Sequence, residues 1–157
     1  MLLASPAFGA SHVVLSFVGI FAGFAVLGAL LEGEVRRDAW THVFLIATLA
    51  TSLTGFLFPF NGFTPAIGTG IVATLVMIPT LLAIYRFDLE GSWRKRYVIG
   101  AVVSLYLNTF VLVVQSFLKF PHLNALAPNG NEPPFAVAQG LVLVFFAYAG
   151  WRAVKRL

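Results

Sequence analysis

Uncharged and strongly apolar stretches dominate this chain, and their lengths limit what it can fold into. Five of these stretches contain no Lys, Arg, Asp or Glu. A helix that rises about 1.5 Å per residue needs roughly 20 residues to cross about 30 Å of hydrocarbon. Each stretch is near that length, so the sequence predicts five transmembrane helices. The predicted spans are residues 13–31, 41–60, 66–85, 97–118 and 135–151.

The composition supports a membrane protein. Hydrophobic residues make up 59% of the chain and charged residues 10%, which is too apolar for a soluble domain of 157 residues. We therefore expect an all-α integral membrane protein, a five-helix bundle that forms one domain over residues 1–157. The one long connection between predicted spans is residues 119–134, which we place outside the membrane. External loops on rigid scaffolds often carry function.

Basic residues predict the orientation of the bundle. Nine of the ten Lys and Arg residues fall in three clusters, within residues 36–37, 86–96 and 152–156. Two spans separate successive clusters, so all three should lie on one side of the membrane. Cationic loops stay in the cytoplasm, which puts the N-terminus outside and the C-terminus inside. Because the clusters are explained as topology signals, we expect the lipid bilayer as a partner and no nucleic acid.

Several strings in the chain resemble a group of small bacterial multi-spanning membrane proteins to which no activity is assigned. The likeness runs through nearly the whole chain. The resemblance implies a compact helical protein of the bacterial inner (plasma) membrane, and it brings no functional residue with it. The strings that carry it are SHVVLSFVGI, LTGFLFPF, SLYLNTFVLVVQSFLKFP, LAPNGNEPPF and AQG.

Polar residues fall on one face of the fourth predicted span. At about 100° per residue, Ser104 and Asn108 lie on the same side of the helix. An amide that faced lipid would have no partner, so Asn108 should point at other helices, and Leu105 should face lipid. Thr48 and Ser52 form a similar stripe on the second span. These residues either bond helices together or line a pocket.

Two backbone features concern helix packing. Gly19 and Gly23 form a GxxxG pattern, which permits close approach of another helix. We favour packing within one chain over contact between two copies. Pro79 lies within the third span and frees the carbonyl of Leu75, which predicts either a static kink or a hinge.

Five residues with ligand-binding chemistry share the outer side of the predicted topology. Their imidazoles, carboxylate and amides suit a metal or hydrogen bonds to a lipophilic ligand such as a quinone. Their spacing matches no metal signature, so no metal is assigned, although two histidines are candidate ligands. The third histidine, His42, lies at the opposite surface. The outer set is His12, Gln115, His122, Glu132 and Gln139.

Three interpretations of function follow. The predicted spans hold no Lys, Arg, Asp or Glu, which argues against proton pumps and ion-coupled transporters. No catalytic motif is evident, so we expect a non-enzymatic protein, without catalytic residues or an indicated cofactor. The first interpretation is an accessory or packing subunit of a larger membrane complex, or a homo-oligomer. The second is a small binding or redox-associated protein with an outer pocket for a lipophilic ligand, haem or metal. The third is a facilitator for a neutral solute.

The predicted topology can be tested with reporter fusions. Because the basic clusters should stay in the cytoplasm, successive fusions should read inside, outside, inside, outside and inside. The measurement is reporter activity at each fusion point in intact cells. A cytoplasmic signal from the fusion after Pro128 would contradict the five-span topology. The fusion points follow Trp40, Asn61, Trp93, Pro128 and Leu157.

Overall fold

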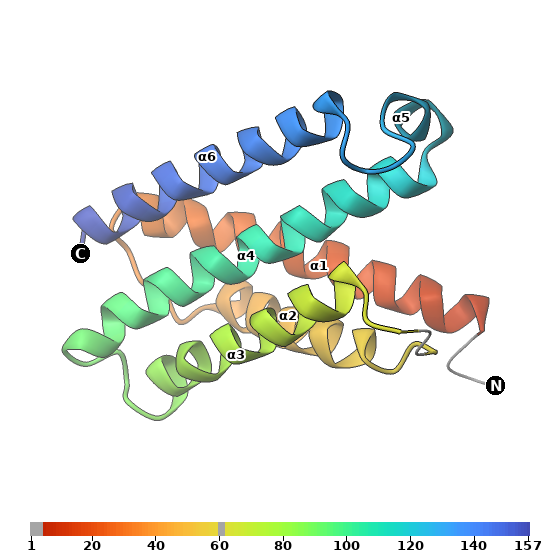
Figure 1. Cartoon of the computed structure of the whole chain (residues 1–157). Coiled ribbons are helices and arrows are strands. Elements are labelled where there is room, and N and C mark those ends of the chain that lie inside the picture. The colour runs from red at the N-terminus through yellow and green to blue at the C-terminus, as the bar shows by residue number, and fades with distance from the viewer. Residues whose placement is uncertain (1–4, 60–61) are drawn as a thin grey trace.

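The computed structural model describes residues 5–59 and 62–157, and in this part the chain forms six helices and no strand (Figure 1). Five helices are long, and the sixth, α5, is one short turn in the predicted external loop. They form an antiparallel bundle in which α4 contacts α1, α3, α5 and α6. The helices are α1 (Pro6–Leu31), α2 (Ala39–Gly55), α3 (Pro65–Tyr85), α4 (Ser92–Lys119), α5 (Pro121–Leu126) and α6 (Pro133–Lys155).

Four helices, α1, α3, α4 and α6, are long and apolar enough to cross a membrane. The chain is therefore an all-α membrane protein. Helix α2 has 17 residues, which rise about 26 Å, slightly less than the hydrocarbon thickness. It ends at Gly55 rather than at residue 60, because the N–H groups of Phe56 and Leu57 bond carbonyls three residues back and Pro59 has no N–H to continue the helix. Phe60, the last residue of the predicted second span, and Asn61 lie outside the described residues.

The other helix boundaries differ from the predicted spans in one consistent way. Helix α1 begins before residue 13, because Ser5 accepts a hydrogen bond from the N–H of Phe8 and Pro6 suits the first turn. Helix α4 likewise starts at Ser92, before residue 97. At the start of α4 and the end of α6, the predicted span stops at a charged residue, whereas the helix continues through charged residues. These two spans are therefore only the central parts of longer helices.

The three basic clusters lie at the same end of the bundle, which we call the charged end. Figure 1 shows the C-terminus and the α1–α2 and α3–α4 connections together at the left of the view. The guanidinium of Arg37 pairs with Asp88 at 2.9 Å and donates to the carbonyl of Ile84. A Cβ on Gly33, whose φ is +86°, would lie 3.0 Å from the carbonyl oxygen of Arg156. The α1–α2 connection thus contacts both the α3–α4 connection and the end of the chain.

Buried side chains gather in the half of the bundle next to the charged end. We call this part the closed half, and the remaining parts of α1, α3, α4 and α6 the open half. Outside the closed half, Phe117 and Ala127 are the only buried residues that the structure describes. Residues 106–116 of α4 are all half-buried. The closed half consists of residues 19–30 of α1, 41–52 of α2, 73–84 of α3, 97–105 of α4 and 146–153 of α6.

Glycines set the helix spacing in the closed half. A Cβ on Gly23 would lie 2.6 Å from the side chain of Leu105 and 2.9 Å from that of Phe44, on two different helices. A Cβ on Gly100 would lie 1.9 Å from the hydroxyl oxygen of Thr80. Gly19 faces α2 as well, so the GxxxG pattern packs within this chain. These contacts allow the backbones to approach closely, as small residues do in membrane bundles.

The prediction that Leu105 faces lipid is wrong. Its side chain is 1% exposed and packs in the core with α1. A helix with one polar face can still be covered on its other faces, and α4 contacts helices on several sides. Pro79, by contrast, is exposed within a continuous α3, and the hydroxyl of the following Thr80 donates to the carbonyl of Val76 at 2.7 Å. Whether Pro79 acts as a hinge stays a prediction.

Candidate functional site

The polar stripes of α2 and α4 meet inside the bundle. The Asn108 side-chain amide donates to the hydroxyl oxygen of Thr48 at 3.2 Å. Thr48 is fully buried, and Ser52, one turn further along α2, is buried too. The buried hydroxyl of Ser104 donates to the sulfur of Met77 at 3.4 Å, which ties α4 to α3. These contacts have the form of hydrogen bonds that hold helices together.

Two residues of the predicted outer set join neighbouring helices. The Nδ1 atom of His12 lies 2.9 Å from the hydroxyl oxygen of Thr54, and the His12 ring meets Phe58 edge-on. The side-chain amide of Gln139 donates to the carbonyl of Phe110 at 3.1 Å, which ties α6 to α4. The other side-chain atom of Gln139, Oε1, is buried and has no donor among the described residues. Within the predicted set, this oxygen is the one buried side-chain atom that lacks a partner among the described residues.

The remaining members of the outer set lie near the same end but have other surroundings. The Glu132 carboxylate accepts bonds from the backbone N–H groups of Asn129 and Asn131 and from the Asn129 side chain. Partial desolvation raises the pKa of Glu132, but these hydrogen bonds together outweigh it and the net shift is downward. His122 is exposed on α5, and Gln115 is half-buried on α4. Glu132 therefore acts locally to close the connection before α6.

No hydrogen bond or ion pair within residues 5–59 and 62–157 joins two members of this set. The same residues contain no group of three His, Asp or Glu side chains that could hold a metal. His12 and His122 lie on different helices, α1 and α5. A shared outer ligand for the five residues stays a prediction.

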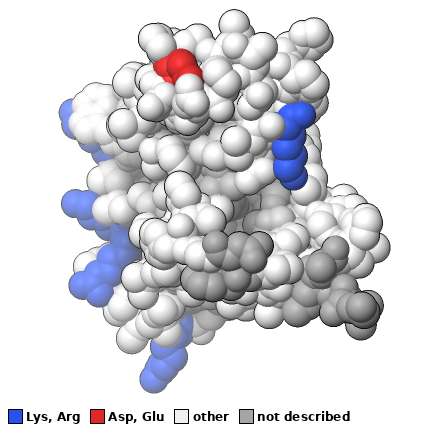
Figure 2. Space-filling model, turned by 45° about the vertical axis from the view of Figure 1, so that its right-hand side comes forward, with Lys and Arg blue, Asp and Glu red and all other residues white. Residues whose placement is uncertain are grey.

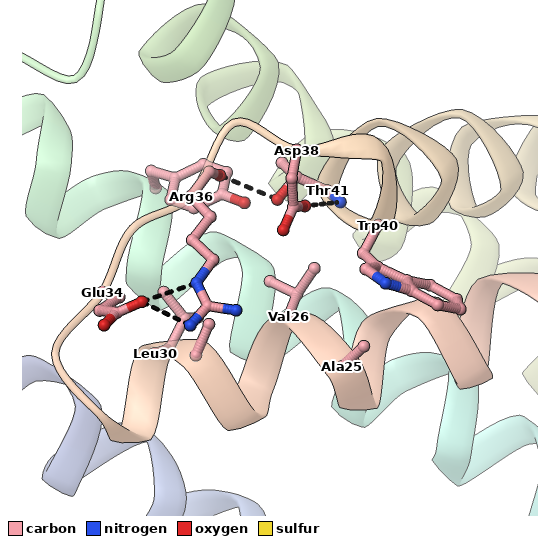
Figure 3. A pocket seen from close by; sticks show the side chains of 10 residues that line it. Ala25, Val26, Leu30, Glu34, Arg36, Asp38, Trp40 and Thr41 are labelled. Carbon is pink, nitrogen blue, oxygen red and sulfur yellow. Dashed lines mark hydrogen bonds and ion pairs between the residues drawn. The ribbon is translucent and has the colours of Figure 1, made fainter.

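A cavity of about 140 Å³ lies at the charged end, where sequence reasoning placed only orienting charges (Figure 3). Its apolar floor is the last turns of α1, including Val26 and Leu30. Arg36 and Asp38, from the α1–α2 connection, and Trp40, from the start of α2, form its walls. The cavity depends on the way one short connection folds back over its own helix.

Hydrogen bonds hold the polar walls of this cavity in place. Arg36 donates through Nε to the Glu34 carboxylate at 2.6 Å. Asp38 caps α2 by accepting from the N–H of Thr41 at 3.0 Å, and the Thr41 hydroxyl donates to the carbonyl of Arg36. The side-chain bond to Glu34 raises the pKa of Arg36, and the backbone bond from Thr41 lowers the pKa of Asp38. Both groups are therefore ionised at neutral pH.

Tyr97 lines the same cavity from the first turns of α4. Its side chain is fully buried, and its hydroxyl has no hydrogen-bond partner among the residues that the structure describes. A buried hydroxyl without a partner costs free energy, typically about 1–3 kcal/mol. The one sequence signal for this site was a tyrosine at the charged border of a predicted span, which aromatic belts also produce.

The surface around the charged end has the character of a membrane interface. Figure 2 shows Lys and Arg gathered mainly along one edge of an otherwise nearly uncharged face. Trp93 stacks on Phe87 with a ring separation of 4.1 Å, and the guanidinium of Arg96 lies 4.4 Å from the Trp93 ring. Lys155 lies in the same way over Trp151. Such aromatic and cationic side chains favour the headgroup region of a bilayer.

No protein-family model matches this chain, and no curated protein or solved structure shows significant similarity to it. The resemblance to small bacterial membrane proteins therefore stays a prediction. Function has to be argued from the geometry of this chain.

The bond between Asn108 and Thr48 can be measured with a double-mutant cycle. Asn108→Leu and Thr48→Val each remove one partner, so the double variant should lose less stability than the sum of the two single losses. We expect a coupling of about 0.6 kcal/mol, the usual value for such bonds in membranes. The measurement is the free energy of unfolding in one detergent. A coupling of zero would show that the bond does not hold α2 to α4.

Proposed function

We propose that this chain is a non-enzymatic accessory subunit whose open half packs against another protein within the membrane. It would cross the bacterial inner membrane five times, with the N-terminus outside and the charged end in the cytoplasm. The observation that carries the proposal is the uneven burial of the bundle. In the closed half, the helices cover one another and bury their facing side chains. In the open half, Phe117 is the one buried residue on the long helices that the structure describes.

The surface of the open half supports a packing role. Val14 on α1 and Leu141 on α6 are both exposed. Lipid can cover such side chains, and apolar area alone gives no preference for protein over lipid. Polar groups do give that preference. The Oε1 atom of Gln139, on the open half of α6, lacks a partner in the described part of the chain, and a neighbouring helix could supply a donor.

Two features support five crossings in the proposed orientation. Helix α2 is short, but local thinning of the bilayer and the interfacial Trp40 at its start can compensate for a deficit of a few ångströms. All three basic clusters lie at one end, as cytoplasmic loops require. With five crossings, that end holds the C-terminus and the opposite end holds the start of α1.

The second candidate function is an outer site for a lipophilic ligand. The unpaired Oε1 atom of Gln139 favours it, because a ligand hydroxyl or N–H could donate to that atom. No comparable observation supports a facilitator for neutral solutes. Thr48 and Ser104 are fully buried, and their hydroxyl groups contact Asn108 and Met77.

Photocrosslinking in native membranes tests the subunit proposal. A photoreactive residue replaces Leu141 on the open half or, as a matched control, Ile46 on the closed half; their exposed fractions are 68% and 65%. We expect protein adducts of discrete mass at Leu141, because a partner helix covers it, and lipid adducts alone at Ile46. Mass spectrometry of the adduct identifies the partner, and an adduct of twice the chain mass identifies a second copy.

The contrary outcome is equally clear. If both positions gave lipid adducts alone, or the same protein adducts, the open half would not be a specific interface. The proposal would then fail, while the helix packing would stand.

A further inference from the structure

The cavity at the charged end contains a group that the fold leaves unsatisfied. Tyr97 is 0% exposed, and its hydroxyl has no partner among the placed residues. The Thr41 hydroxyl, which lines the same cavity, uses its hydrogen for the carbonyl of Arg36 at 2.8 Å, so it does not donate to Tyr97. A molecule in the cavity could satisfy the Tyr97 hydroxyl. That molecule would sit among groups of both charge signs.

Three charged side chains line the cavity: Arg36 is positive, and Glu34 and Asp38 are negative. Figure 3 shows the Asp38 carboxylate above Val26 and the Arg36 guanidinium beside Val26, bordering the same space. Arg36 uses Nε and Nη2 to bind Glu34, which leaves Nη1 for a further acceptor. Asp38 uses Oδ1 to cap α2, which leaves Oδ2 for a further donor. A site with one acceptor and one donor of opposite charge matches a zwitterion better than a simple cation or anion.

The cavity also lies where a lipid headgroup would be. It lies between the end of α1 and the start of α2, at the charged end, which also carries Trp93 and Arg96. Trp40, which is 57% exposed, and the exposed Ala25 form its rim toward the lipid side. Its volume of about 140 Å³ equals the liquid volume of about five waters. That is room for an ammonium and a phosphate but not for acyl chains, which would lie along the apolar exterior.

We propose that this cavity binds the phosphoethanolamine headgroup of a membrane phospholipid. The ammonium donates to Oδ2 of Asp38 and to the Tyr97 hydroxyl oxygen, and the phosphate accepts from Nη1 of Arg36. Both acceptors require N–H donors, which a choline headgroup lacks. A glycerol headgroup carries the phosphate but offers no positive charge to Asp38. Ethanolamine lipid is therefore selected over choline and glycerol lipids. This inference does not depend on the proposed subunit role.

The test uses the full chain, purified in mild detergent and stripped of lipid. Thermal unfolding and native mass spectrometry are recorded with phosphatidylethanolamine, phosphatidylcholine or phosphatidylglycerol, and with soluble phosphoethanolamine. Phosphatidylethanolamine should give the largest rise in melting temperature and the most retained lipid.

Tyr97→Phe keeps the ring and removes one hydrogen bond, so it should weaken retention about fivefold. Tyr106→Phe, on the half-buried part of α4, is the matched control and should retain lipid like the original chain.

A second pair of variants guards against loss of folding at the buried Tyr97. Arg36→Gln changes an exposed side chain of the cavity, and Arg94→Gln changes an exposed side chain of the same end that does not line it. Only the former should lower lipid retention. Equal retention of all three lipids, or unchanged retention in both Tyr97→Phe and Arg36→Gln, would overturn the proposal. Soluble phosphoethanolamine that bound as well as the lipid would overturn the lipid source.

Discussion

Close approach of helix backbones at two glycines is the contact on which the rest of this structure depends. Gly23 lets α1 come against Phe44 of α2 and Leu105 of α4, and Gly100 lets α4 come against Thr80 of α3. In lipid, helices gain little from hydrophobic burial and are held by packing and by hydrogen bonds between them. Short backbone separations are therefore what make the contacts of the closed half favourable, including the bond between Asn108 and Thr48.

The two ends of the bundle consequently have different properties. At the charged end, the ion pair between Arg37 and Asp88 links the α1–α2 and α3–α4 connections, and Gly33 contacts the last residues of the chain. Contacts between its connections hold this end together, and it contains a polar cavity. At the other end, the helices contact each other less and leave apolar side chains exposed. A partner or a ligand could cover these side chains. The proposed subunit role and the proposed lipid site thus belong to opposite ends of one molecule.

Much of the fold, but little of the candidate site, could be predicted from the sequence. Hydropathy found the central part of each long helix, and the charge clusters correctly shared one end. Hydropathy failed where backbone chemistry decides, as at Gly55, where α2 ends. The prediction that Leu105 faces lipid also failed, because the polar face of a helix does not show how many other helices pack against it. The cavity near Tyr97 was missed because one short connection folds back over its own helix, between α1 and α2, and because Tyr97 comes from α4, far away in the chain.

The helix contacts of the closed half stabilise the whole bundle. The free energies of unfolding of two Gly→Ala variants, one in each half, test this most directly. Gly100→Ala puts a methyl group against Thr80, whereas Gly140→Ala, on the open half of α6, meets nothing within 4 Å. With both variants in the same lipid, Gly100→Ala should lose about 1–3 kcal/mol through overpacking. Gly140→Ala should be unchanged or slightly more stable, because alanine favours a helix over glycine. Equal changes in the two variants would contradict a bundle closed at one end only.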